Sequence, residues 1–117
     1  MITDMAEKLK RINILGEDYI IRPDNASNPK LIDAAAYCEL YSKEIVYDES
    51  LLDKNDCQKF NKLEEYSKKV LRHEAMHAIF FESGCNSWAN NEELVDFIAV
   101  QYPKIKKIFD EIERAAI

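Results

Sequence analysis

The chain has 117 residues, of which 47% are hydrophobic and 32% charged, and its formal net charge is −6. This is the composition of a globular protein, and the length suits a single domain spanning residues 1–117. The acidic balance argues against direct nucleic-acid binding, which needs a basic face. There is neither an apolar run of membrane-spanning length nor a signal-peptide core, so we expect no membrane contact and a cytoplasmic location.

Three cysteines, Cys38, Cys57 and Cys85, are spaced without a CxxC pattern. Their odd number and spacing argue against a disulfide framework and against a zinc site made of cysteines alone. We therefore expect free thiols.

Two pairs of alternating segments in the first half of the chain predict β-hairpins. The expected strands are residues 11–15, 19–22, 35–41 and 44–47. Pro23 is expected to end the second of them. We expect the four strands to form a small antiparallel sheet with one face packed on a helix.

A long helix is expected after an acidic connector. It begins at Asn55 or Asp56, both good cap residues, and ends before Gly84, which suits the left-handed position after a helix. Residues 85–89 are expected to form a loop that carries the only tryptophan.

Two further helices are expected at the C-terminus. Asn90 or Asn91 caps the first, residues 92–102, and Pro103 stands at a first-turn position of the second. The predicted fold is therefore α+β: a small antiparallel sheet of two hairpins packed on a long helix, followed by two C-terminal helices.

The only two histidines of the chain lie in the pattern HExxH on the expected long helix. His73 and His77 fall one turn apart on one helical face, where two imidazoles can bind one metal ion. Glu74 lies beside the pair and can take a proton from water. The flanking segment is apolar on nearly every side, which is typical of a core helix in which polar groups need partners. A metal site is favoured over the alternative, a pair of core histidines without metal.

Two histidines do not complete a catalytic zinc site, which usually has three protein ligands. The metzincin pattern is excluded, because Phe80 and Ser83 stand where it needs glycine and a third histidine. With no other histidine in the chain, the third ligand must be a carboxylate or a cysteine.

The expected helix after residue 91 offers that carboxylate. Glu92 and Asp96 share one face, so Glu92 can bind the metal while Asp96 accepts the second N–H of a histidine. Glu93 is the alternative third ligand if the helix is rotated, and Cys85 is a further one. Glu92 and Glu93 are also acids of the kind favoured in a first helical turn without any metal.

With these motifs, the chain resembles the gluzincin metallopeptidases, in which HExxH is followed by a helical E-x-x-x-D. More narrowly, residues 71–84 and 91–99 resemble small phage-type proteins grouped with the ImmA/IrrE-like metallopeptidases and sometimes labelled SprT-like. The likeness extends over most of residues 10–103. It implies a single minimal zincin-like domain over residues 1–117 and a zinc-dependent endopeptidase with a protein or peptide substrate. The context it implies is a phage or mobile element, in which some relatives cleave transcriptional repressors.

The resulting hypothesis is peptide hydrolysis with His73, His77 and Glu92 as zinc ligands and Glu74 as the base. A second electrophile is needed for the developing oxyanion, and tyrosines are the candidates; they are Tyr37, Tyr41, Tyr47 and Tyr102. The alternative is a non-catalytic domain whose metal site serves folding or partner binding.

Overall fold

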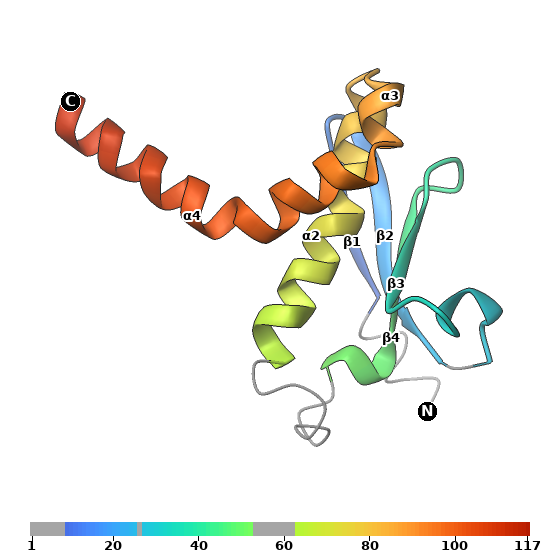
Figure 1. The fold of residues 1–117 in the computed structure, drawn as a ribbon. Helices are drawn as coiled ribbons and strands as arrows, with labels where there is room; N and C mark the ends of the chain where they lie inside the picture. The colour runs from blue at the N-terminus through green and yellow to red at the C-terminus, as the bar shows by residue number, and fades with distance from the viewer. Residues whose placement is uncertain (1–8, 26, 53–62) are drawn as a thin grey trace.

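The computed structural model describes residues 9–25, 27–52 and 63–117 of the chain. Its architecture is α+β: one face of a four-stranded sheet packs on the long helix α2, and a second long helix, α4, crosses α2 and extends away from it (Figure 1). The strands are β1 (Lys10–Ile14), β2 (Glu17–Asp24), β3 (Ala36–Glu39) and β4 (Glu44–Asp48), and the helices are α2 (Leu63–Glu82), α3 (Asn86–Ala89) and α4 (Glu92–Ala116). Two short 3-10 helices, η1 (Pro29–Leu31) and η2 (Glu49–Leu52), complete the described elements.

The sheet is mixed, so the prediction of an antiparallel sheet is wrong. Both hairpins form, because β1 pairs with β2 and β3 pairs with β4 in antiparallel fashion. They join through β2 and β4, which run parallel, in the order β1-β2-β4-β3. The connection from β2 to β3 crosses the end of the sheet, and this non-local pairing leaves no mark on the alternation within each strand.

Pro23 does not end β2, which continues to Asp24. Within the described residues, the β1–β2 ladder stops at Ile21, so Pro23 lies where β2 pairs with β4 on one side. A proline is tolerated at such a position because its missing N–H can face the unpaired side. Its ring is among the most deeply buried side chains.

The core lies between the sheet and α2. One buried cluster joins Ile14, Tyr19 and Ile45 of the sheet to Ala78 of α2, and a second joins the β3–β4 end of the sheet to Val70. Ala78 is fully buried, and its small side chain lets the helix approach the strands closely. The expected packing of the sheet on this helix is confirmed.

The described part of α2 begins at Leu63, and the predicted start at Asn55 or Asp56 lies outside the described residues. The predicted end is confirmed: α2 stops at Glu82, and Gly84 follows with a φ of +80°, a left-handed conformation that suits glycine. Residues 85–89, predicted to be a loop, instead contain the one-turn helix α3, which is too short to show periodicity.

The two predicted C-terminal helices are one continuous helix, α4, with Pro103 inside it. A proline in a helix interior removes the N–H that would bond to the carbonyl four residues earlier, here that of Ala99. In this structure Arg72 of α2 replaces it, since its Nε donates to the Ala99 carbonyl oxygen over 2.8 Å. This bond from a neighbouring helix is why the helix continues where local sequence predicts a break, and α4 bends in its middle part (Figure 1).

None of the helices in the described segments is long and apolar enough to cross a membrane. Cys38 and Cys85 are free thiols, as expected, and Cys57 lies outside the described residues. Burial, followed by the negative charge of Glu74, raises the pKa of the Cys38 thiol to about 12.

Besides the bond from Arg72 to Ala99, a polar contact at Glu82 joins the end of α2 to the sheet. The Glu82 carboxylate accepts a hydrogen bond from the Tyr19 hydroxyl over 2.6 Å and pairs with the Lys43 ammonium. The Lys43 bond, and then the Tyr19 bond, lower the pKa of Glu82. Burial and the same carboxylate raise the pKa of Tyr19 far above its usual value, so the phenol stays protonated and donates.

The Arg72–Pro103 arrangement predicts a coupling between two substitutions. Arg72→Met should lower the free energy of unfolding by about 1–3 kcal/mol, because the Ala99 carbonyl loses its donor. In a Pro103→Ala background the cost should be smaller, since residue 103 then supplies an N–H. A double-mutant cycle by urea denaturation measures the difference, and an equal cost in both backgrounds would contradict the account.

The Glu82 contact predicts a pH-dependent contribution to stability. Because the pKa of Glu82 is lower in the folded protein, its contribution is present above the unfolded pKa and is lost as the pH falls through the folded value. Glu82→Gln should therefore cost about 1.5–3 kcal/mol at neutral pH and progressively less on acidification. Urea denaturation of both proteins across the pH range measures this, with the exposed Glu65→Gln as the control. A cost that does not change with pH would show that the Glu82 charge is not involved.

Candidate metal centre

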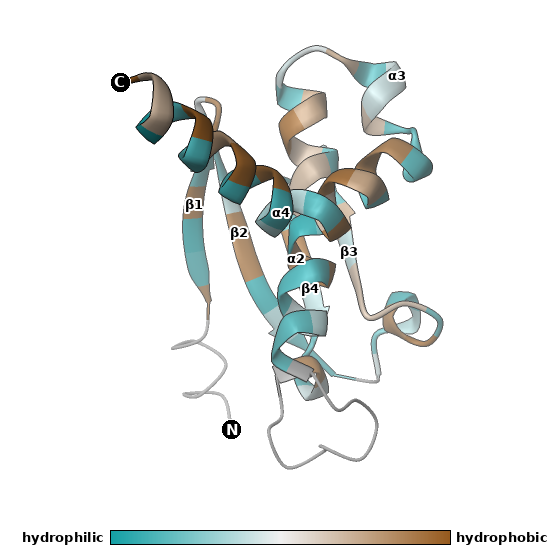
Figure 2. Ribbon diagram, turned by 60° about the vertical axis from the view of Figure 1, so that its left-hand side comes forward, coloured by the Kyte–Doolittle hydropathy of each residue, from teal (hydrophilic) through white to brown (hydrophobic). Residues whose placement is uncertain are grey.

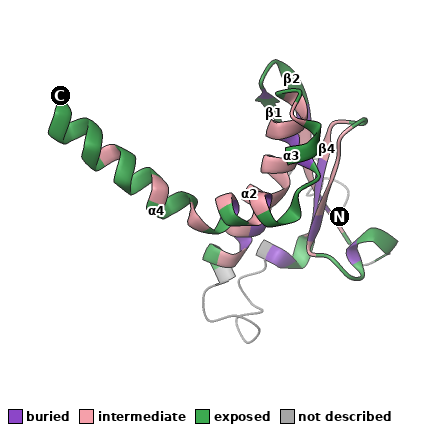
Figure 3. Cartoon of the chain, turned by 45° about the horizontal axis from the view of Figure 1, so that its top comes forward, coloured by how far each residue is buried: buried purple, intermediate pink, exposed green. Residues whose placement is uncertain are grey.

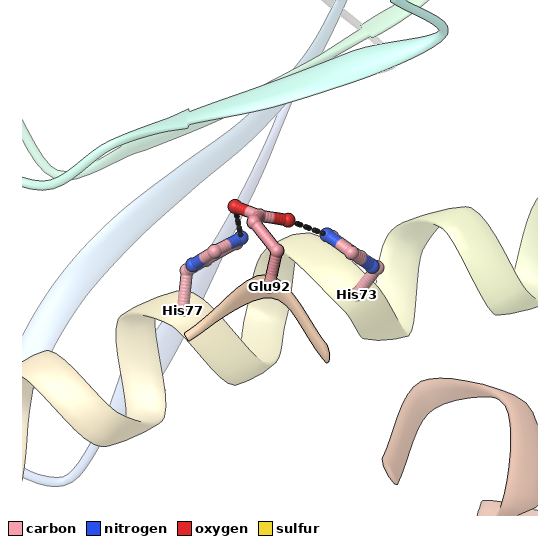
Figure 4. Close-up of side chains that lie close together, drawn as sticks. All are labelled: His73, His77 and Glu92. Carbon is pink, nitrogen blue, oxygen red and sulfur yellow. Dashed lines mark hydrogen bonds and ion pairs between the residues drawn. The ribbon is translucent and has the colours of Figure 1, made fainter. Parts of the chain in front are cut away.

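Three side chains from two helices converge at one point, where α2 meets the start of α4 (Figure 4). One ligand atom each from His73, His77 and Glu92 lies within 4.8 Å of the other two. The Nε2 atoms of His73 and His77 lie 2.9 and 3.0 Å from the two different carboxylate oxygens of Glu92. The site is half open, because the Glu92 side chain is 70% exposed while those of His73 and His77 are 18% and 13% exposed.

Local sequence accounts for these positions. His73 and His77 are four residues apart on α2, and their rings meet edge to face with centroids 5.1 Å apart. Asn91 caps α4 by accepting the backbone N–H of Leu94 over 3.0 Å, which starts the helix at Glu92. Of the two predicted cap residues, Asn91 is therefore the one used, and it fixes which acid faces the histidines.

The far nitrogen of each histidine also faces an oxygen. His73 Nδ1 lies 3.1 Å from Asp96 Oδ1, and His77 Nδ1 lies 2.6 Å from the backbone oxygen of Ala89. A carbonyl oxygen only accepts, so the Nδ1 of His77 carries the proton. Burial acts to raise the pKa of Asp96, but hydrogen bonds from His73 and Lys69 outweigh it and hold that pKa below its usual value.

The hydrogen-bonding roles of these atoms indicate whether His73, His77 and Glu92 suit a metal ion. In a neutral imidazole one nitrogen donates and the other presents a lone pair. With Nδ1 donating to Ala89, a neutral His77 turns the lone pair of its Nε2 toward a Glu92 oxygen, which is also an acceptor. Two lone pairs facing each other repel unless a proton or a cation lies between them. Donors around a tetrahedral zinc lie about 3.3 Å apart for bonds of about 2.0–2.1 Å. The two nitrogen–oxygen distances of 2.9 and 3.0 Å are near this spacing, so two imidazoles and one carboxylate are a donor set that suits zinc.

The remaining site residues predicted from the sequence are placed as follows. Glu74 is half-buried, and burial raises its pKa, while His73 and His77 lower it and Glu92 raises it. Within the described part of the chain, Glu74 makes no hydrogen bond, which leaves its carboxylate available to a substrate or water. Glu93 is exposed and is not part of the cluster, and Cys85 is not part of it either.

None of the four candidate tyrosines makes a hydrogen bond or ring contact with His73, His77 or Glu92. The Tyr37 hydroxyl accepts from Asn28, and Tyr41 is 91% exposed. Tyr47 lies in the core, and Tyr102 lies beside the Arg72 guanidinium in a groove between α2 and α4. The structure therefore assigns no oxyanion donor among them.

One contributor could not be found from the sequence: the Ala89 backbone oxygen that orients His77. It comes from the last residue of α3, and no side chain marks it. The cap residue Cys85 and the single turn of α3 place this carbonyl beside α2. The nearest pattern in the sequence, the Asn90-Asn91 pair, indicates where the next helix starts but not where the Ala89 carbonyl points.

Comparisons of this chain with protein-family models, with curated proteins and with solved structures give no match.

The geometry predicts which acid binds the metal. Glu92→Gln should weaken zinc binding by about a hundredfold or more, because an amide oxygen replaces a charged ligand. Glu93→Gln, the matched change one residue along the same exposed turn, should leave it unchanged. Zinc affinity by competition with a chromophoric chelator measures both. If Glu93→Gln lost most of its zinc affinity while Glu92→Gln kept it, the metal ligand would be Glu93 and the prediction would be wrong.

Proposed function

We propose that this protein is a zinc-dependent endopeptidase in which His73, His77 and Glu92 hold the metal. The observation that carries the proposal is the convergence of two imidazole Nε2 atoms on one carboxylate while both Nδ1 atoms face other oxygens. Two neutral ligands and one carboxylate leave about one net positive charge on Zn²⁺. Three protein ligands also leave a coordination position free, as catalytic zinc sites require.

When bound, zinc would polarise a peptide carbonyl and lower the pKa of a water molecule. The residues of this chain supply the rest. Glu74 follows His73 on α2, so its carboxylate lies beside the ligands without being one of them. It can take a proton from the attacking water and pass it to the leaving amine. Asp96 and the Ala89 carbonyl keep the imidazoles oriented throughout.

The sheet supports a peptide as the substrate. β3 is at the edge of the sheet, and Cys38 of this strand packs against the core cluster that includes Ala78 of α2. The charge of Glu74 acts on the Cys38 thiol, so the middle of β3 lies near the proposed base. An edge strand presents unpaired backbone groups that an extended peptide can pair with. A peptide added to β3 would run past Glu74 with its backbone held by hydrogen bonds.

The resemblance of the HExxH segment and the E-x-x-x-D segment to the ImmA/IrrE-like metallopeptidases supports the same reaction. It also suggests a regulatory protein as the substrate, in a phage or mobile-element setting.

The test separates metal binding from catalysis. Glu74→Gln should keep stoichiometric zinc, because Glu74 is not a ligand, yet it should hydrolyse an unfolded test protein at least about a hundredfold more slowly. Glu65→Gln, an exposed change on the same helix, should keep both properties. Elemental analysis and a time course of cleavage by gel measure the two.

Two outcomes would count against the proposal. Equal cleavage by the wild type and by Glu74→Gln would exclude Glu74 as the base. Zinc binding without cleavage of any unfolded protein by the wild type would instead support a non-catalytic metal-binding domain.

A further inference from the structure

The C-terminal half of α4 carries an apolar stripe that nothing in the described part of the chain covers. Ile108, Phe109 and Ile112 are 53%, 59% and 56% exposed. This half of the helix extends away from the sheet and α2 (Figure 1), and brown, hydrophobic bands recur along it (Figure 2). In Figure 3 the same half is mostly exposed and shows no buried residue. A large exposed apolar stripe marks an interaction surface.

The stripe has the spacing of a coiled-coil seam. Positions separated alternately by three and four residues are apolar apart from Gln101; they are Ile98, Gln101, Ile105, Ile108, Ile112 and Ala115. This is the a/d pattern with which one helix packs along another. The segment from 98 to 115 has 18 residues and is about 27 Å long at 1.5 Å per residue.

The charges beside the seam identify the partner. Lys104 and Glu111 are seven residues apart and occupy the same flanking position, g, of successive heptads. In an antiparallel pair of identical helices, g positions face each other, so the lysine of one helix meets the glutamate of the other. In a parallel pair each g position faces an e position, and the e positions here are Tyr102 and Phe109.

We infer that this surface binds a second copy of the chain, with the two α4 helices packed antiparallel about a twofold axis. Ile105 then packs against Ile108 of the partner subunit, and Lys104 pairs with Glu111 of the partner subunit. The symmetry repeats each contact, so the interface has two central isoleucine layers and two flanking ion pairs. On the other flank, Tyr102 meets Phe109 of the partner subunit.

An apolar groove adjoins this seam and extends the interface. The groove has a volume of about 320 Å³ and lies between α2 and α4; it is lined by Arg72, Ala75, Met76, Ile79, Ile98, Ala99 and Tyr102. In the same register Ile98 faces Ala115 of the partner subunit, and Gln101 faces Ile112 of the partner subunit. The last turns of the partner's helix therefore lie across the groove.

The flanking charges disfavour a membrane as the occupant. A helix that lies on a membrane surface is rich in lysine and arginine along its polar face. Here the three lysines of residues 104–107 are followed by three acids, Asp110, Glu111 and Glu113. A basic segment followed by an acidic one is complementary to its own reversed copy.

Sedimentation equilibrium of the full chain tests the inference, and the wild type should be a dimer. Ile108→Glu should weaken the dimer on the order of a hundredfold, because it buries an unpaired charge in a central layer. Val100→Glu, which adds the same charge to an exposed position off the seam, should leave the dimer unchanged. Far-UV circular dichroism and zinc affinity check that each variant is folded, since the candidate ligands lie on α2 (His73, His77) and at the other end of α4 (Glu92), away from the substituted positions.

A charge exchange tests the antiparallel register. Lys104→Glu and Glu111→Lys should each weaken the dimer by about fivefold, because both ion pairs become repulsive. The double variant restores both pairs with reversed polarity and should regain the wild-type affinity. A monomeric wild type, a dimer unaffected by Ile108→Glu, or a double variant no better than the single ones would overturn the inference. None of these outcomes depends on proteolysis, so the two proposals fail independently.

Discussion

The proposed centre depends on one constraint: the Nδ1 of His77 is turned toward a backbone oxygen, which can only accept. This contact fixes the tautomer of the imidazole and points its Nε2 lone pair at the place where a cation would sit. His73 is held in the corresponding way by Asp96, although a carboxylate leaves its tautomer less tightly determined. Glu92 then faces two imidazoles at once, and a cation between the three groups would relieve the repulsion between the His77 lone pair and the carboxylate.

The short segment between α2 and α4 supplies both the group that orients His77 and the start of the helix that carries Glu92. The last residue of α3 provides the Ala89 oxygen, and the Asn91 cap begins α4 immediately afterwards, so the orienting group and the candidate third ligand lie three residues apart. Farther along, the bond from Arg72 to the Ala99 oxygen holds α4 against α2. Val95 and Ala99 are fully buried between these anchor points. The first part of α4 is therefore fixed at both ends, which keeps Glu92 in place even though its side chain is largely exposed.

The parts of this structure that could be predicted from the sequence are those with a local cause. Alternation gave both hairpins, and helical spacing put His73 and His77 on one face and Glu92 with Asp96 on another. What was missed has a non-local cause. The parallel pairing of β2 with β4 depends on how two hairpins meet, and the Ala89 carbonyl has no side chain to reveal it. The helix boundary predicted at Pro103 follows from local rules but is wrong, because Arg72 of α2 donates to the Ala99 carbonyl oxygen that the missing N–H leaves without its helical partner.

Pro103 also lies between two parts of α4 with different surroundings. Before it, the helix faces α2 and carries the candidate ligand and the orienting carboxylate. After it, the bend carries the helix away from the body, and its apolar stripe is exposed. A straight α4 would follow a different path relative to α2. In the proposed dimer the seam begins before Pro103, at Ile98 beside the groove, and continues along the exposed part of α4. The Arg72 side chain, which donates to the Ala99 carbonyl oxygen left without its helical partner, also lines the groove between α2 and α4.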